Sequence, residues 1–158
     1  MRVGIGYDSH RFDPSRRLLL GGIEIADEPG LAGHSDADAV AHAVTDAILG
    51  AAGLGDIGMH FSPDDDRWRD ADSIELLREA TAHLGESNFQ VVNVDVSVIC
   101  ERPRLAPHVT AMRGRLAEAL GIAPANVSVK GKSNESMGWI GRGEGIAVIA
   151  VALVDRVP

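Results

Sequence analysis

Gly4-Ile5-Gly6-Tyr7-Asp8-Ser9-His10 predicts the first strand of a sheet and carries two potential metal ligands. Apolar residues alternate with the two glycines, which is the period of an extended chain. Residues two apart in a strand point to the same side, so we expect the Asp8 and His10 side chains to be neighbours. A carboxylate and an imidazole supply two of the three protein ligands of a catalytic zinc site, which keeps one position open. Alternatively, both residues end the strand in a solvated turn.

A helix further along the chain offers the third ligand, His42. Apolar residues recur at helical spacing over 40–51, with Ser35 as the predicted N-cap. His42 is expected about two turns into this helix, off the apolar stripe, with Asp38 and Asp46 one turn away on either side. A metal-bound imidazole usually donates its other N–H to a carboxylate or carbonyl, and either aspartate can accept it. Such a histidine is equally typical of a partly exposed helix surface.

The rest of the chain alternates predicted strands and helices without a linker or an internal repeat. The first strand is expected to give way to a polar turn over 11–17. The later elements are, in order, two short strands within 18–25, a loop around Pro29, a helix capped by Asp72, a strand over 89–100, a helix opened by Pro107, a strand from Val127, a glycine-rich turn over 138–145 and a strand over 146–154. The last strand is almost continuously apolar, which predicts a central place in the sheet.

Composition limits the class of protein. The chain has 158 residues, of which 45% are hydrophobic and only 4% aromatic, so we expect one domain with an aliphatic core. The net charge of −8 argues against nucleic acid or a membrane surface as partner, although a metal and a few basic residues can still bind a phosphorylated small molecule. The single cysteine, Cys100, excludes an internal disulfide and favours a cytoplasmic location. No apolar run is long enough to predict a membrane span.

Two polar segments suit an anionic ligand. The segment 101–107 contains two arginines and two prolines, and it is either an ordinary connection or a rim that meets a phosphate or nucleotide. The segment 130–135 combines two lysines, a hydroxyl and a glutamate, a set that suits an anion together with a divalent cation. It is not a P-loop, because the spaced glycines before the Lys-Ser pair are missing. His34 precedes the helix that carries His42, where free N–H groups favour an anion.

Several of these stretches together resemble the 2-C-methyl-D-erythritol 2,4-cyclodiphosphate synthase family. The matching residues are Gly6-Tyr7-Asp8-Ser9-His10, His34-Ser35-Asp36 with His42, Gly55-Asp56-Ile57-Gly58 and Gly141-Arg142-Gly143-Glu144-Gly145. The similarity covers essentially the whole chain, with the motifs in order. It implies a single compact α/β (α+β) domain over 1–158, with a mixed sheet covered by about three helices on one face. It also implies a cyclic homotrimer with its active sites at the subunit interfaces.

The resemblance assigns roles by motif position. It implies that Asp8, His10 and His42 hold one Zn²⁺ per subunit, and that Glu135 holds Mg²⁺ or Mn²⁺ on the substrate diphosphate. His34 and Ser133 are implied as the catalytic residues that stabilise the transition state. The implied substrate-binding residues are Asp8, Ser9, His10, His34, Ser35, Asp56, Ile57, Gly58, Phe61, Ser62, Pro63, Asp64, Asp65, Cys100, Glu101, Arg102, Pro103, Arg104, Leu105, Ala106, Lys132, Ser133, Asn134, Glu135, Trp139 and Arg142.

The implied reaction is an intramolecular cyclisation. In 4-diphosphocytidyl-2-C-methyl-D-erythritol 2-phosphate, the 2-phosphate attacks the β-phosphorus of the diphosphate, and CMP leaves. This makes the chain a phosphorus–oxygen lyase of the non-mevalonate isoprenoid pathway, with a cytidine diphosphate substrate. Two alternatives remain open: a zinc hydrolase of phosphate esters that uses the same ligands, and a trimeric module that binds an isoprenoid diphosphate in the trimer core, near Arg142.

Overall fold

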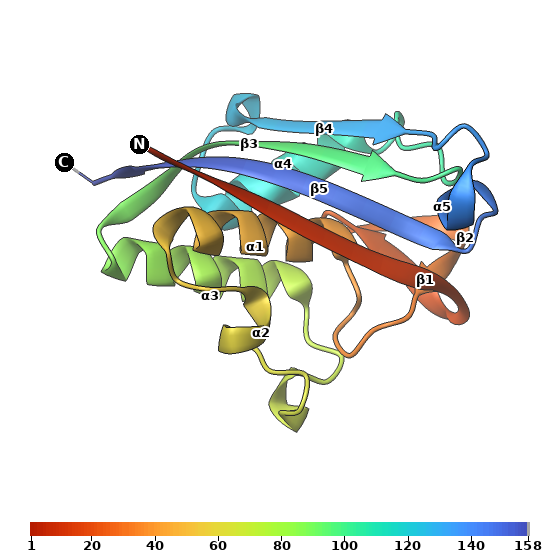
Figure 1. Ribbon diagram of the computed structural model, residues 1–158, viewed down its shortest axis with the longest axis horizontal. Helices are drawn as coiled ribbons and strands as arrows, with labels where there is room; N and C mark the ends of the chain where they lie inside the picture. Colours follow the sequence, from red (N-terminus) through yellow and green to blue (C-terminus); the bar gives the residue numbers. More distant parts are fainter. Residues whose placement is uncertain (158) are drawn as a thin grey trace.

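The computed structural model describes residues 1–157, which fold around one five-stranded mixed sheet (Figure 1). The strand order is β2-β1-β5-β3-β4, with β3 and β4 parallel and the other neighbours antiparallel. The strands are β1 Arg2–Leu20, β2 Ile23–Leu31, β3 Phe89–Ile99, β4 Val127–Lys132 and β5 Gly145–Arg156. The α-helices are α1 Ala39–Ala52, α2 Ile57–His60, α3 Ser73–Glu86, α4 Val109–Leu120 and α5 Gly138–Gly141, with 3₁₀ turns at Asp66–Trp68 and Pro124–Asn126.

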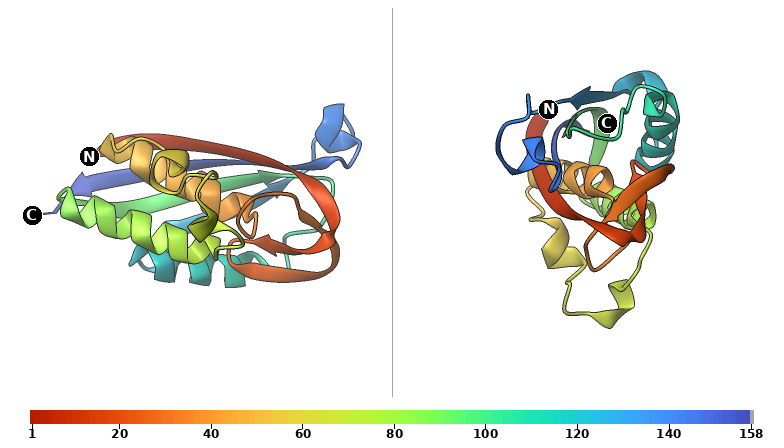
Figure 2. Two further views of the ribbon diagram at one scale, coloured as in Figure 1. Left: turned by 90° about the horizontal axis from the view of Figure 1, so that it is seen from below. Right: turned by 90° about the vertical axis from the view of Figure 1, so that its right-hand side faces the viewer.

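The predicted α+β class and the central place of the last strand are confirmed. The three long helices α1, α3 and α4 lie on one face of the sheet (Figure 2). The core between them is aliphatic, with fully buried side chains such as Ile48, Leu77, Met112 and Ile146. Within residues 1–157, no helix is both long and apolar enough to cross a membrane.

The prediction of a turn over 11–17 was wrong, because β1 continues through this segment. Its first half pairs with β5 and its second half with β2, and the pairing with β2 shifts register between Asp13 and Leu18. A bulge of this kind tolerates Pro14, which has no N–H to donate to a ladder. The loop expected around Pro29 is likewise strand, since β2 runs on to Leu31. The predicted glycine-rich turn over 138–145 contains the short helix α5.

The alternation in β1 places its glycines against α1. A Cβ on Gly4 would lie 2.0 Å from the carbonyl oxygen of Ala47, and one on Gly6 would lie 1.9 Å from that of Ala43. Only glycine therefore lets the helix backbone approach the strand so closely. Asp8 shares this inward side, because it is an even number of residues further along the strand.

The opposite face of the sheet carries no helix in the described residues, and part of it is apolar. The outward side chains of Val3, Ile5 and Tyr7 on β1 are 69%, 69% and 57% exposed. Ile149 and Val151 on β5 extend this exposed apolar face. Apolar side chains gathered in this way on an open sheet face are typical of a surface that another chain covers.

The caps explain where the helices begin and end. Asp72 caps α3 and accepts the N–H of Ile74, as the sequence predicts, and Gly121 ends α4 in the left-handed conformation. The predicted N-cap of α1, Ser35, was wrong. Asp38 fills that position, because its carboxylate accepts the N–H groups of residues 40 and 41 at the open end of the helix. His42 consequently lies in the first turn of α1, not two turns in.

Candidate metal centre

Asp8, His10 and His42 converge where the end of the glycine segment of β1 meets the first turn of α1. Oδ2 of Asp8 lies 2.8 Å from Nε2 of His10 and 2.9 Å from Nδ1 of His42. The two imidazole nitrogens are 3.4 Å apart. We call these three residues the triad. They are the group of histidine and acidic side chains within the described residues that is compact enough to share a metal ion.

The electrostatics of the triad favour an ionised carboxylate. Burial by itself raises the pKa of Asp8, but hydrogen bonds and charge from His42 and His10 outweigh it and hold that pKa well below its usual value. Burial lowers the pKa of His10, whereas the contact with Asp8 raises it by more, so the net shift is upward. Asp8 therefore brings an ionised carboxylate to the triad, next to the two imidazole rings.

The ring of His10 is fixed by a backbone carbonyl. Nδ1 of His10 lies 2.6 Å from the carbonyl oxygen of Ala32. Because a carbonyl can only accept, Nδ1 carries a proton, which leaves Nε2, the nitrogen that faces Asp8, as the atom that would bind a metal ion. This is the arrangement that a metal-binding histidine requires.

The ring of His42 is held by hydroxyl groups and not by Asp38 or Asp46, so that prediction was wrong. Nε2 of His42 lies 2.9 Å from Oγ of Ser73 and 3.0 Å from Oγ of Ser35. Asp38 is turned away and accepts the N–H groups of the 21–22 turn, while Asp46 accepts the N–H of residue 57. Both aspartates thus serve backbone N–H groups, and Asp38 does so in the buried interior.

The triad fits a zinc ion by its donor chemistry. It offers two neutral imidazole nitrogens and one carboxylate oxygen, and three such ligands leave a fourth position free. A carbonyl or hydroxyl supports each ring from behind, as in known metal sites. The side chains are only 13% to 23% exposed, so a bound ion would be shielded from bulk water on the protein side.

A cavity of about 280 Å³ opens beside the triad, and we call it the triad cavity. It brings the three ligands together with most of the residues predicted around them. Besides the triad, its walls are His34, Ser35, Ile57, Gly58, Phe61, Pro63, Trp68 and Leu76. Trp68 and Leu76 were missed, because an isolated aromatic in a polar loop and a helical leucine carry no signal of a site in the sequence.

Other predicted residues of this region support the loop and do not line the triad cavity. Asp56 caps α2 through the N–H of residue 59, and Ser62 accepts the N–H of Asp64. Asp65 pairs with Arg67, which lowers the pKa of Asp65, and its carbonyl lies 3.4 Å from the ring of His34. Ser9 lies outside the triad cavity and lines a small one with Trp139.

A second cavity, of about 340 Å³, lies at the ends of β3 and β4, and we call it the strand-end cavity. Arg102 is not among its walls, since its guanidinium packs over the ring of Phe12. Burial, followed by two nearby glutamates, raises the pKa of Cys100 to about 11, so this thiol is inert at neutral pH. The walls are Cys100, Glu101, Pro103, Arg104, Leu105, Ala106, Val109, Gly131, Lys132 and Ser133.

The loop after β4 is held in an unusual conformation. Oε1 of Glu101 accepts the N–H groups of Asn134 and Ser136 at 3.0 and 3.1 Å. Glu135 and Ser136 both have positive φ, at 51° and 59°, which costs conformational energy outside glycine. The hydroxyl of Ser133 donates to the exposed carboxylate of Glu135 at 2.9 Å. Glu101 thus binds backbone N–H groups, whereas the side chains of Ser133 and Glu135 contact each other.

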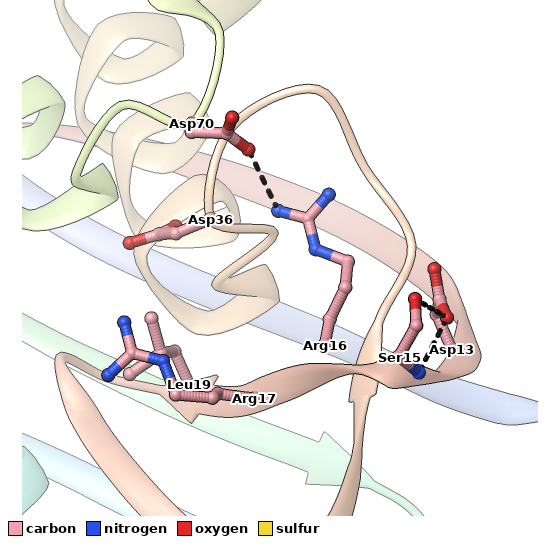
Figure 3. A pocket seen from close by; sticks show the side chains of 7 residues that line it. All are labelled: Asp13, Ser15, Arg16, Arg17, Leu19, Asp36 and Asp70. Carbon is pink, nitrogen blue, oxygen red and sulfur yellow. Dashed lines mark hydrogen bonds and ion pairs between the residues drawn. The ribbon is translucent and has the colours of Figure 1, made fainter.

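A third cavity, of about 570 Å³, is distinct from these two (Figure 3). One of its two arginines, Arg16, points across it to Asp70 at 3.7 Å and donates to the carbonyls of Gly33 and Ser35. The guanidinium is therefore occupied in holding the loop that carries His34. Arg142, predicted to bind substrate, pairs with Glu144 on the surface at 2.6 Å.

Comparisons with known proteins agree over nearly the full chain. The model of the YgbB family matches residues 1–155. The 2-C-methyl-D-erythritol 2,4-cyclodiphosphate synthase of Rubrobacter xylanophilus is 58% identical, over 98% of this chain and 95% of that protein. The protein of the same name from Symbiobacterium thermophilum is 53% identical, over 98% of each chain. Among solved structures, the CDP complex of IspF from Plasmodium falciparum has a TM-score of 0.86 at 32% identity, and the match covers 99% of this chain and 97% of that one.

Proposed function

This chain belongs to the YgbB family, and on that premise we propose that it acts as a 2-C-methyl-D-erythritol 2,4-cyclodiphosphate synthase. The observation that carries the proposal is the convergence of Asp8, His10 and His42 at the wall of a cavity. In the proposed reaction, the 2-phosphate of 4-diphosphocytidyl-2-C-methyl-D-erythritol 2-phosphate attacks the β-phosphorus of the diphosphate. The cyclic diphosphate forms and CMP leaves, which makes the reaction that of a phosphorus–oxygen lyase.

The triad would hold Zn²⁺, through one carboxylate oxygen and two imidazole nitrogens. When bound, the ion would supply positive charge that neutralises phosphate oxygens. The protein has to press two anionic phosphates together, so its own contribution is positioning and the exclusion of water. Phe61, Trp68 and Leu76 give the triad cavity an apolar wall that suits this task. His34, on the same wall, is proposed to donate a hydrogen bond to phosphate.

The strand-end cavity would take the cytidine diphosphate part of the substrate. Arg104 and Lys132 line it and would face the phosphates. Glu135 would hold a second divalent ion, Mg²⁺ or Mn²⁺, once the diphosphate is in place, with Ser133 beside it as the second catalytic residue. The bound CDP named for the Plasmodium falciparum relative supports a cytidine nucleotide as ligand.

We further propose that the active site forms between subunits of a cyclic homotrimer. Two observations support this. The triad cavity and the strand-end cavity have no wall residue in common among the described residues. The sheet face over β1 and β5 leaves Val3, Ile5 and other apolar side chains exposed. A heterologous contact on this face would join two different patches and can place the triad of one subunit beside the strand-end cavity of the next. Cys100, the single cysteine, supports a cytoplasmic location.

The decisive test is product analysis. Purified protein with Zn²⁺ and Mg²⁺ is given the cytidyl substrate, and phosphorus NMR follows the products. We expect the cyclic diphosphate and CMP in equal amounts. An opened phosphate without the cyclic product would indicate a zinc hydrolase instead. Binding of isoprenoid diphosphates without any turnover would indicate a binding module.

A further inference from the structure

Ser73, at the first position of α3, connects the triad to a carboxylate that does not touch it. The Ser73 hydroxyl is 2.9 Å from Nε2 of His42 on one side. On its other side it donates to Oδ1 of Asp36 in a short contact. The backbone N–H of Ser73 donates to the second oxygen of Asp36 at 3.0 Å. Ser73 is 1% exposed, so its hydroxyl is shielded from bulk water.

The hydrogen bonds that link His42, Ser73 and Asp36 have one consistent direction. The Asp36 carboxylate is an acceptor, so the single hydroxyl proton of Ser73 is directed toward it. The Ser73 oxygen is then left with lone pairs toward His42 and can only accept from Nε2. A proton on Nε2 satisfies this contact and the one with Oγ of Ser35 at 3.0 Å, and it leaves Nδ1, which faces Asp8, as the nitrogen that would bind a metal ion.

We propose that Ser73 and Asp36 are positioning residues that orient His42 and prepare its Nδ1 as a metal ligand. They do for His42 what the carbonyl of Ala32 does for His10. In known metal sites a carboxylate often contacts the histidine directly, whereas here the Ser73 hydroxyl lies between them. The negative charge of Asp36 makes the His42 ring more basic and so a better metal ligand. This inference rests on the proposed zinc centre. It assigns a function to a serine on a third element, α3, which none of the sequence motifs contains.

The test measures metal affinity directly and does not depend on turnover. Parent, Ser73→Ala and Asp36→Asn proteins are titrated with Zn²⁺ in competition with a chromophoric chelator. We expect both variants to bind zinc about 10-fold to 100-fold more weakly, as for other supporting partners of metal ligands. Asp36→Asn preserves size, but its amide can donate to Ser73 and turn the hydroxyl toward His42, which disfavours the proton on Nε2.

Thr45→Val is the matched control. Thr45 is a fully buried hydroxyl on the helix of His42, and it bonds only to the carbonyl of Ala41 at 2.8 Å. Its loss should change zinc affinity by less than about 2-fold, since it leads to no ligand. Thermal unfolding of the zinc-free proteins shows whether each variant is folded, and alanine is favoured at helical positions such as that of Ser73.

A double-mutant cycle separates a relay from two independent structural effects. If Ser73 and Asp36 act in series, the double variant should bind zinc no more weakly than whichever single variant binds it less tightly. Losses that multiply would overturn the proposal, as would parent-like affinity in folded Ser73→Ala. If the parent protein itself binds no zinc, the proposed zinc centre fails, which is a different result from failure of the relay.

Discussion

The triad and the loop of Ser133 and Glu135 differ in how firmly the fold holds them. The triad is buried between a strand and a helix whose backbones touch, and hydrogen bonds support both histidine rings from behind. Ser133 and Glu135 are exposed on a loop that one glutamate, Glu101, ties to the strand-end cavity. The first site has its ligand geometry before any ligand arrives, whereas the second presents side chains to a partner yet to be bound.

This difference teaches which part of the proposed chemistry belongs to one chain. A preorganised cluster loses little entropy when it binds a metal, so zinc binding should be a property of each subunit by itself. The loop of Glu135 should acquire its second cation only together with a diphosphate. Four experiments test this contrast, in order of decreasing effect.

Loss of a triad ligand should have the largest effect. We expect His42→Ala to lower turnover by at least ~10³-fold, since metal charge at a phosphoryl oxygen is worth several kilocalories per mole. Zinc content by elemental analysis and the rate of CMP release are the measurements. The control is His83→Ala, a change at a histidine of α3 outside the triad cavity and the strand-end cavity. It should keep the parent's zinc content and rate of CMP release. Full zinc occupancy in His42→Ala would refute the ligand assignment.

Adding one methyl group to Gly6 should damage the triad without touching a ligand. The new Cβ would lie 1.9 Å from the carbonyl oxygen of Ala43, so α1 has to move away from β1. We expect unfolding free energy to fall by about 3 kcal/mol, at the upper end of overpacking costs, and zinc affinity to fall with it. Denaturant unfolding measures the first quantity. Gly114→Ala, where a Cβ meets nothing within 4 Å, should leave zinc affinity unchanged and, inside α4, raise the unfolding free energy by up to about 1 kcal/mol.

Glu101→Ala should affect only the loop of Ser133 and Glu135 at the strand-end cavity. Without this carboxylate, the N–H groups of Asn134 and Ser136 lose their acceptor, and the positive-φ pair at 135–136 relaxes. We expect CDP affinity, measured by calorimetry with Mg²⁺, to fall about 10-fold, in line with the loss of hydrogen bonds to a charged group. Zinc affinity should remain that of the parent. A parallel loss of zinc affinity would mean that the triad and the loop of Ser133 and Glu135 are not independent.

Mixed refolding tests whether the two ends of one active site come from different chains. His42→Ala and Glu135→Gln proteins, each inactive alone, are unfolded together in equal amounts and refolded. An active site is complete when its triad comes from a Glu135→Gln chain and its Glu135 loop from a His42→Ala chain. Each has a chance of about one half, so roughly a quarter of parent activity should return. Proteins refolded separately and then mixed are the control. If mass measurement confirms mixed trimers that remain inactive, the two halves lie on one chain.

Much of the fold could be predicted because it follows from local patterns. The alternation around Gly4 and Gly6 predicts a strand, and its period places Asp8 and His10 on one side. The cap at Asp72 is a short-range signal that the structure confirms. The boundaries of β1 were not predictable, because the polar residues at 11–17 are strand only through pairing with β2, across a register shift that no local pattern signals.

The sequence by itself predicted Asp8, His10 and His42 as candidate metal ligands, and the structure brings these three side chains together. Only the tertiary structure decided what supports them. Asp38 is one helical turn from His42, yet burial commits it to amides at residues 21, 22, 40 and 41. Ser73, 31 positions away in the chain, takes the place expected for it. The reason is physical: a buried polar group bonds to whatever packing brings within 3 Å, and packing is set by the whole fold.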